Sequence, residues 1–162
     1  MISSFAFVCH AQTDADKASV NHVVTSLFNS WNNHDFKDMS SYTTEDADFI
    51  NPVGVWWKGR SDAQKSLQHL HDTMLKNTPD TVLSTTTRFV TPSVALVIFI
   101  SKTGTFYFPD GVDNGHNKHG DNRAVSIMVI VKQNDKWLLA ATQGTDINEY
   151  VIKMDPLNRT PQ

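Results

Sequence analysis

Near its start the chain repeats apolar residues at the three-to-four-residue spacing of an amphipathic helix. The apolar set is Val20, Val23, Val24, Leu27, Phe28 and Trp31. Thr13 followed by Asp16 is a shorter-armed capping box, so this helix is predicted to begin after Thr13 and to end at the run NNH. Residues 35–42 predict a short second helix, with Phe36 and Met39 facing inward.

A short strand and a third helix follow. Residues 46–51 alternate polar and apolar positions as in a strand, and the Pro-Val-Gly run after them ends it. Ser61 followed by Gln64 is another N-cap pattern, and it predicts a helix that ends near residues 77–79. The inward face of this helix is predicted to hold Ala63, Leu67, Leu70, His71 and Met74.

After Pro79 the apolar period changes to two, and the segments are rich in Val, Ile, Thr and Phe. The predicted strands cover residues 81–91, 93–108, 122–133 and 136–145. Short turns join neighbouring strands at residues 91–93 and 133–136, which implies antiparallel pairing. The order of these elements is helices, one short strand, a helix and then long strands. This order predicts an α+β domain, with the helices on one face of a curved antiparallel sheet.

Length and composition fit one domain with one core, because the chain has 162 residues and 40% of them are hydrophobic. We expect an N-terminal extension or signal-peptide remnant over residues 1–15, a single domain over residues 16–155 and a tail over residues 156–162. The net charge of −3 and the lack of a Lys or Arg run argue against a nucleic-acid partner or an anionic membrane surface.

The first residues allow two interpretations. Small residues at Cys9 and Ala11 suit signal-peptidase cleavage after Ala11, although a basic n-region and a full-length apolar core are missing. In one interpretation residues 1–11 are the remnant of an export signal, and the protein is periplasmic or secreted. In the other they are an extension that packs on the domain, and the protein is cytoplasmic. Cleavage would remove Cys9, the single cysteine.

Three stretches together resemble the nuclear transport factor 2-like superfamily, which includes SnoaL-like polyketide cyclases and ketosteroid isomerase. The stretches are SLFNSWNNHDFKDMSSYTTEDADFINPVG (26–54), VWWKGRSDAQKSL (55–67) and NRAVSIMVIVKQNDKWLLAATQGT (122–145). Their spacing is most similar to the SgcJ/EcaC branch, whose members are often small bacterial proteins. The resemblance implies a cone-shaped, cystatin-like fold with the sheet wrapped round the helices, a pocket at the open end, and a homodimer paired through the outer sheet face.

The resemblance also allows a test of known chemistry. Ketosteroid isomerase has a carboxylate base before the Pro of its DP-x-G turn; here that position is Asn51, whose amide cannot accept a proton at neutral pH. By spacing, its oxyanion-hole tyrosine falls at Leu27 and its protonated acid at Ile127. We therefore expect isomerase chemistry to be absent. SnoaL-like cyclases use an acid in the pocket, and spacing places none inside, because Asp46 and Asp48 alternate away from Asn51.

Candidates for lining the pocket are Asn51, Trp56, Trp57, His71, Tyr107, Arg123 and Thr142. Asn51 either hydrogen-bonds a ligand or caps the local turn. One of the adjacent tryptophans is expected to face inward, as a cover for a ligand or as a packed lid. His71 shares an apolar helix face and is either a core residue or an acid–base group.

Two strand positions depend on the predicted register. Arg123 begins a strand whose odd-numbered residues match inward positions of the isomerase, so its side chain is expected at the mouth of the pocket. There it either clamps a carboxylate or enolate of a ligand or forms a salt bridge at the rim. Thr142 is expected to face inward with Ala140 and Gly144, and Gln143 outward.

The loop over residues 109–121 gathers Asp, Asn and His side chains, which raises a metal hypothesis. Val112 occupies a required ligand position of the calcium-loop pattern, and the final bidentate Glu is missing. Gly, Asn and Asp are also what a long flexible hairpin needs, so we interpret the loop as a mobile lid. We expect neither a metal nor a cofactor.

Three functions stay open at this stage. The first is a dimeric binding module for a small, apolar or aromatic molecule. The second is a SnoaL-like enzyme acting on a carbonyl or polycyclic substrate, with Arg123 and Asn51 as polarising groups. The third is an accessory protein with no ligand. The binding module is the preferred function of the three. An Asp, Glu or His side chain inside the pocket would overturn that preference, and a cavity filled by Trp31, Phe49 and Trp57 would exclude any ligand.

Overall fold

The computed structural model describes residues 13–157. The elements within this range are α1 (Asp14–Asn32), η1 (Met39–Ser41), β1 (Thr43–Ile50), β2 (Trp56–Lys58), α2 (Arg60–Asp72), β3 (Asp80–Thr91), β4 (Val94–Thr103), β5 (Phe106–Tyr107), β6 (Lys118–His119), β7 (Arg123–Gln133), β8 (Lys136–Asp146) and α3 (Glu149–Ile152). The predicted export signal and Cys9 lie outside the described residues. Of the described helices, none is long and apolar enough to cross a membrane.

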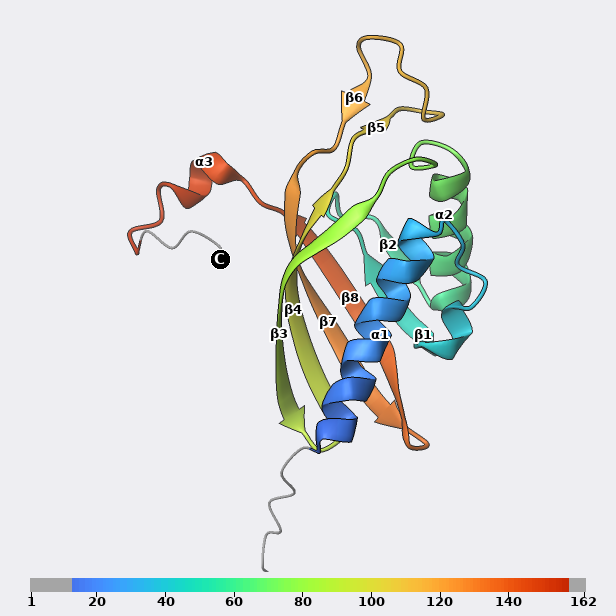
Figure 1. The fold of residues 1–162 in the computed structure, drawn as a ribbon, viewed down its shortest axis with the longest axis vertical. Helices are drawn as coiled ribbons and strands as arrows, with labels where there is room; N and C mark the ends of the chain where they lie inside the picture. The colour runs from blue at the N-terminus through green and yellow to red at the C-terminus, as the bar shows by residue number, and fades with distance from the viewer. Residues whose placement is uncertain (1–12, 158–162) are drawn as a thin grey trace, which may run out of the picture.

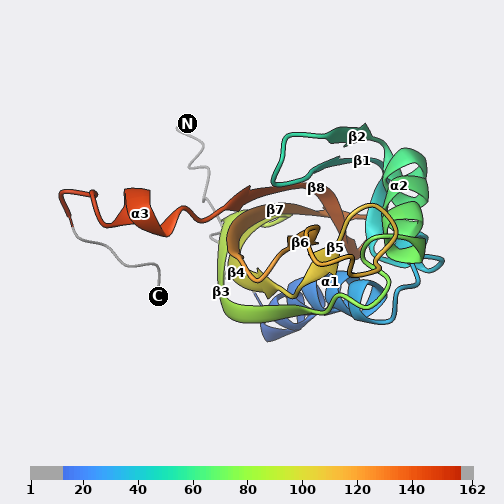
Figure 2. The ribbon, with the colours of Figure 1, turned by 90° about the horizontal axis from the view of Figure 1, so that it is seen from above.

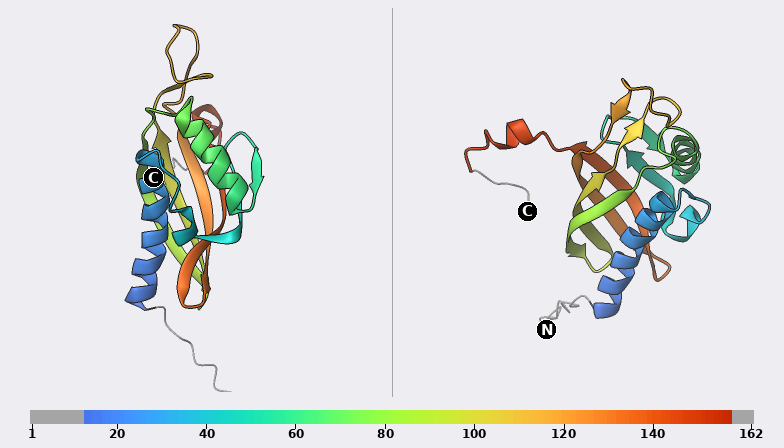
Figure 3. Two further views of the ribbon diagram at one scale, coloured as in Figure 1. Left: turned by 90° about the vertical axis from the view of Figure 1, so that its right-hand side faces the viewer. Right: turned by 45° about the horizontal axis from the view of Figure 1, so that its top comes forward.

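The main sheet has the strand order β2-β1-β8-β7-β4-β3. Its pairs are antiparallel except β1 with β8, which run parallel. The sheet curls on itself, and α1 and α2 close its open side (Figures 1 and 2). The β5–β6 hairpin stands at one end of the domain, and α3 extends away from the sheet (Figures 1 and 3). The predicted α+β fold with a curved sheet is confirmed.

The first helix begins where its cap predicts. The Thr13 hydroxyl oxygen accepts a hydrogen bond from the backbone N–H of Asp16 at 3.1 Å. The Asp16 carboxylate also accepts from the Trp137 indole at 2.8 Å and from the Lys132 ammonium at 3.1 Å, which ties the helix to the β7–β8 hairpin. The hydrogen bonds from Thr13, Trp137 and Lys132 hold the pKa of Asp16 below its usual range.

Two predicted helices differ from the structure. Over residues 35–42 only the short 3-10 turn η1 forms, yet Phe36 and Met39 are fully buried as expected. The third helix begins at Arg60 after Gly59, which has a φ of 78°, and no side chain caps it. The predicted cap Ser61 therefore lies inside the first turn. A left-handed Gly at the junction explains how the chain turns into α2 without a side-chain cap.

The inward face of β7 is opposite to the predicted one. Ala124, Ser126, Met128 and Ile130 are buried, while the odd-numbered Val125 and Ile127 are 38% and 37% exposed. A shift of one residue moves every side chain of a strand to the other face, so the predicted inward positions of β7 were wrong for the whole strand.

The last strand changes register at a β-bulge, where Ala140 is left out of the pairing with β7. Trp137 and Leu139 are buried before the bulge, and Thr142 and Gly144 line the cavity after it. Ala140 itself does not line the cavity. The predicted strand over residues 93–108 is also divided, because β4 ends at Thr103 and β5 pairs with β6 instead.

The core fills the end of the domain away from the β5–β6 hairpin. Its buried apolar side chains come from α1, from the segment around η1, from α2 and from the inward faces of β1, β4, β7 and β8. They include Val20, Phe36, Met39, Met128, Ile130 and Leu139. Burying each contributes about 1.5–3 kcal/mol to stability. Towards the other end the packing stops and leaves a cavity.

Candidate functional site

A cavity of about 1030 Å³ opens between the two main helices, the end of β1 and the inward faces of β4, β7 and β8. Its wall is mainly apolar and includes Leu27, Trp31, Phe49, Trp57, Leu70 and Phe99. The aromatic residues that could have filled the pocket therefore form its wall. A largely apolar concavity of this size matches the usual dimensions of a small-molecule site.

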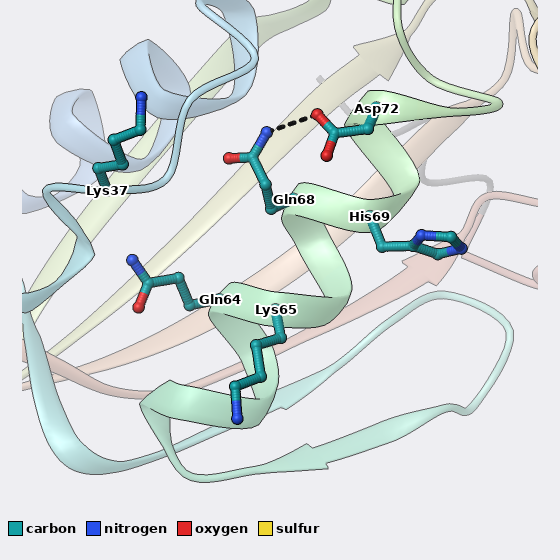
Figure 4. A pocket seen from close by; sticks show the side chains of 6 residues that line it. All are labelled: Lys37, Gln64, Lys65, Gln68, His69 and Asp72. Atoms are coloured by element: carbon teal, nitrogen blue, oxygen red, sulfur yellow. Dashed lines mark hydrogen bonds between the residues drawn. The ribbon is translucent and has the colours of Figure 1, made fainter.

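A second hollow of about 410 Å³ lies on the solvent side of α2 (Figure 4). The amides in it are engaged: Gln64 donates to the backbone oxygen of Phe36 at 2.7 Å, and Gln68 donates to that of His34 at 3.1 Å. These bonds attach the segment after α1 to α2. The hollow is thus part of the helix packing, and the larger cavity is the candidate site.

Asn51 lies in the cavity wall at the end of β1. Its side-chain oxygen accepts hydrogen bonds from the backbone N–H groups of Val53 at 3.2 Å and Val55 at 2.8 Å. Gly54 completes this turn with a φ of 87°, a conformation that favours Gly. The side chain thus caps the turn, and its oxygen is already used.

The adjacent tryptophans point in opposite directions. Trp57 lines the cavity. Trp56 is 51% exposed, donates its indole N–H to Asp48 at 2.8 Å, and has the Lys58 ammonium 4.1 Å from its ring centroid. Successive residues of a strand alternate between faces, so Trp56 points away from the cavity and does not line it as predicted.

Arg123 and Tyr107 are also outside the cavity wall. Arg123 shares the outward face of β7 and donates through Nε to the Glu149 carboxylate at 3.0 Å. Of its two predicted roles, the structure shows the rim salt bridge. Tyr107 lies between Phe106 and Phe108, and both of these neighbours line the cavity instead.

His71 is a core residue rather than a wall residue. It is 2% exposed, its Nδ1 lies 2.7 Å from Nδ1 of His34, and the Trp31 and Phe36 rings lie 4.5 and 5.0 Å from its ring. Burial, and then the charge of His34, lower the pKa of His71 to about 4. Its Nε2 is buried and has no hydrogen-bond partner among the described residues.

Asp80, which sequence reasoning missed, is the first residue of β3 and lines the cavity. Its Oδ2 accepts hydrogen bonds from the hydroxyls of Ser101 at 3.3 Å and Thr103 at 3.5 Å. Its Oδ1 is buried without a hydrogen-bond partner in the described part of the chain. Burial raises the pKa of Asp80, and the neighbouring donors, Ser101 first, oppose that rise only in part. The expectation that no acid lies inside the pocket is therefore wrong.

The signal for Asp80 was present in the neighbouring strand. Ser101 and Thr103 are polar residues at the end of a strand that is apolar up to Ile100, and they lie opposite the start of β3 in the register. Polar positions on the inner face of an apolar strand indicate a polar group across from them. Other titratable groups in the wall are His119, Asp146, Glu149 and Tyr150.

The loop over residues 109–121 bonds largely to itself. Asp110, Asp113 and Asn114 each accept a hydrogen bond from the backbone N–H two residues ahead. Such turns explain why the loop is rich in Asp and Asn. The described residues hold no group of three or more His, Cys, Asp or Glu side chains arranged for a metal ion.

A curved sheet round two helices with an apolar cavity at its open end defines the cystatin-like, nuclear transport factor 2-like class. The profile of the SnoaL-like domain family matches residues 24–138. The chain therefore belongs to the SnoaL-like domain family. Comparison with curated proteins gives no match.

Solved structures share this fold at low sequence identity. An uncharacterised cystatin-like protein from Caulobacter vibrioides has a TM-score of 0.80 at 18% identity and covers 89% of this chain and 98% of its own. A cystatin-like domain from Nostoc punctiforme has a TM-score of 0.71 at 20% identity, and the match covers 93% of this chain and 90% of that domain. A candidate dehydratase of the nuclear transport factor 2-like family from Streptomyces avermitilis has a TM-score of 0.68 at 17% identity. The match covers 84% of this chain and 99% of the dehydratase chain.

Proposed function

We propose that the chain binds a small, mainly apolar molecule in its cavity. The observation that supports this most is the apolar concavity of about 1030 Å³, which the side chains of Trp31, Phe49 and Trp57 border without filling. An exposed apolar hollow of this size is costly in water and indicates an occupant. This disfavours an accessory protein with no ligand.

A cavity-blocking pair of variants tests binding. N-phenyl-1-naphthylamine, an uncharged dye that fluoresces in apolar surroundings, serves as the probe. Thr142→Phe puts a ring into the cavity, whereas Gln143→Phe, one residue along β8, puts the same ring on the exposed side. We expect the first variant to bind the dye at least tenfold more weakly and the second to bind like wild type. Equal dye binding by both would contradict the cavity as the site.

The second candidate is an enzyme acting on a carbonyl or polycyclic substrate, and Asp80 is the observation that favours it. Sequence reasoning preferred a binding module because no acid was placed inside, and Asp80 removes that reason. Arg123 and Asn51 no longer support the enzyme, because Glu149 and the local turn engage them. The candidate dehydratase from Streptomyces avermitilis shares the fold alone.

Deuterium exchange distinguishes catalysis from binding alone. We would incubate the protein with 1-indanone in D₂O and follow exchange at the carbon beside the carbonyl by mass spectrometry. An enzyme of this kind exchanges that hydrogen faster than buffer does, and Asp80→Asn loses the acceleration, because an amide cannot take up the proton. Exchange at the buffer rate in wild type would leave only the binding function.

We also propose a homodimer paired through the outer sheet face. Ile98 of β4 lies directly across from Ile127 of β7, and they are 47% and 37% exposed. The segment after β8 extends from the domain and exposes Tyr150 and Val151, which offers further apolar surface to a partner copy (Figure 3). Light scattering tests this, since Ile127→Glu would give monomers. Placement in the SgcJ/EcaC branch rests on sequence spacing and remains part of this proposal.

A further inference from the structure

The two sides of the cavity differ in polarity. The side formed by α1 and α2 is apolar, and its wall residues are Leu27, Phe28, Trp31, Leu67 and Leu70. The side formed by the sheet carries hydroxyl groups, including those of Ser126 on β7 and Thr142 on β8. A polar group on a bound molecule is therefore matched on the sheet side of the cavity.

The hydroxyl of Ser126 has no protein partner. Ser126 is 8% exposed, and its side chain makes no hydrogen bond within the described residues. By contrast, Ser101 and Thr103 in the same wall donate to Asp80. The described side-chain oxygens that are sealed in the protein without a partner belong to Thr44 and Asp80. Because the Ser126 oxygen is not sealed in this way and Ser126 lies in the cavity wall, its hydroxyl is open to the cavity.

The side chains next to this hydroxyl are apolar. In the sheet register Ser126 lies directly across from Phe99 of β4 and Gly144 of β8. Along β7 the neighbouring inward residues are Ala124 and Met128. Gly144 leaves the hydroxyl uncovered, since a Cβ at that position would lie 3.2 Å from the Ser126 oxygen. A nearly buried hydroxyl without a partner is costly, and a polar group on the ligand offsets this cost.

We infer that Ser126 binds a hydroxyl group of the ligand, so that the cavity selects apolar alcohols over hydrocarbons of the same shape. A serine hydroxyl is both a donor and an acceptor, and an alcohol can pair with it in either role. A charged group is disfavoured at this place, because the apolar neighbours of Ser126 cannot solvate it. The inference rests on the proposed binding function, which it makes more specific.

Indane and 2-indanol form a matched probe pair, because they differ by one hydroxyl group on the same rings. Each is titrated as a competitor of the dye N-phenyl-1-naphthylamine, and the measured quantity is the dissociation constant of indane divided by that of 2-indanol. Comparing this ratio between variants cancels the difference in hydration of the two probes. We expect Ser126→Ala to lower the ratio about threefold to tenfold, as loss of one hydrogen bond predicts, while indane binding stays within twofold.

Three further variants separate the Ser126 hydroxyl from other effects. Ser126→Cys keeps the shape of the side chain but has only a weakly hydrogen-bonding thiol, so the ratio should fall as in Ser126→Ala. Thr145→Val removes a hydroxyl from the exposed face of β8 and should leave the ratio unchanged. Thr142→Val removes the second hydroxyl of the wall. Thr142 is less buried than Ser126, so water can replace the ligand there and the ratio should fall less than in Ser126→Ala.

The outcomes separate the two levels of the proposal. If wild type binds neither the dye nor indane nor 2-indanol, the binding function itself fails. If the probes bind and Ser126→Ala leaves their ratio unchanged, binding stands and the role of Ser126 is overturned. A fall in Thr142→Val as large as that in Ser126→Ala also overturns this role. Should Ser126→Ala fail to fold, Ser126→Cys decides by the same criterion.

Discussion

Acidification should destabilise this protein through the buried histidine of α2. Burial, and then the charge of His34, lower the pKa of His71 to about 4, against 6.5 for an ordinary histidine. The unfolded chain then takes up this proton at a higher pH than the folded chain does. The free energy of unfolding therefore falls as the pH is lowered from about 6.5 towards 4, and the loss levels off below 4.

The size of this loss follows from the same two values. A difference between 6.5 and about 4 corresponds to about 3 kcal/mol at pH 4, because one pKa unit is worth about 1.36 kcal/mol. The contact with His34 also favours a lowered pKa for His71. The two Nδ1 atoms lie 2.7 Å apart, so one ring donates and the other accepts, and two protonated rings cannot form this bond.

Urea unfolding at pH 7, 6, 5 and 4, followed by tryptophan fluorescence, measures the effect. The comparison uses wild type, His71→Gln and the matched control His69→Gln, which changes an exposed histidine two residues earlier on α2. Wild type and the control should lose about 3 kcal/mol more than His71→Gln between pH 7 and pH 4. If His71→Gln loses as much as wild type, the buried histidine is not the source of the acid sensitivity and the reasoning is wrong.

Further substitutions test other parts of the structure. Gly120→Ala should lower the melting temperature sharply and disturb the β5–β6 hairpin, since an added Cβ would lie 2.1 Å from the backbone oxygen of Gly104 at a φ of 84°. Met128→Ala should cost about 2–5 kcal/mol in urea unfolding, because its side chain is fully buried. Asp16→Asn should lower the melting temperature at pH 7 and make it less sensitive to pH below 4, since the carboxylate that binds Trp137 is lost.

The fold could be predicted because its periodicities are local and strong. The apolar stripe of α1, its Thr13 cap and the change to period two after Pro79 all appear in the structure at the expected positions. The register of β7 could not be predicted, because both faces of that strand are apolar. Ile127 on one face and Met128 on the other give no contrast, so the pattern cannot show which side faces inward.

The site was harder to predict than the fold. Asn51, Trp57 and Thr142 lie in the cavity wall. The turn after β1 and the alternation of β2 set the directions of the first two, and the bulge at Ala140 turns Thr142 inward. Asp80 was missed because it follows Pro79 at the boundary of a turn and a strand, where an acid is usually exposed. Its backbone is held by Asn32, which is 48 residues away in sequence, and a local pattern contains no such contact.

The junction between the end of α1 and the start of β3 connects the core to the cavity. Trp31 lies in the cavity wall, packs against the His71 ring in the core and donates to Thr78 in the backbone just before β3. Asn32, the next residue, fixes the backbone of Asp80. Because two consecutive residues hold both the wall and the acid, a disturbance of the helix end shifts them together. The acid is thus placed by the packing of the fold.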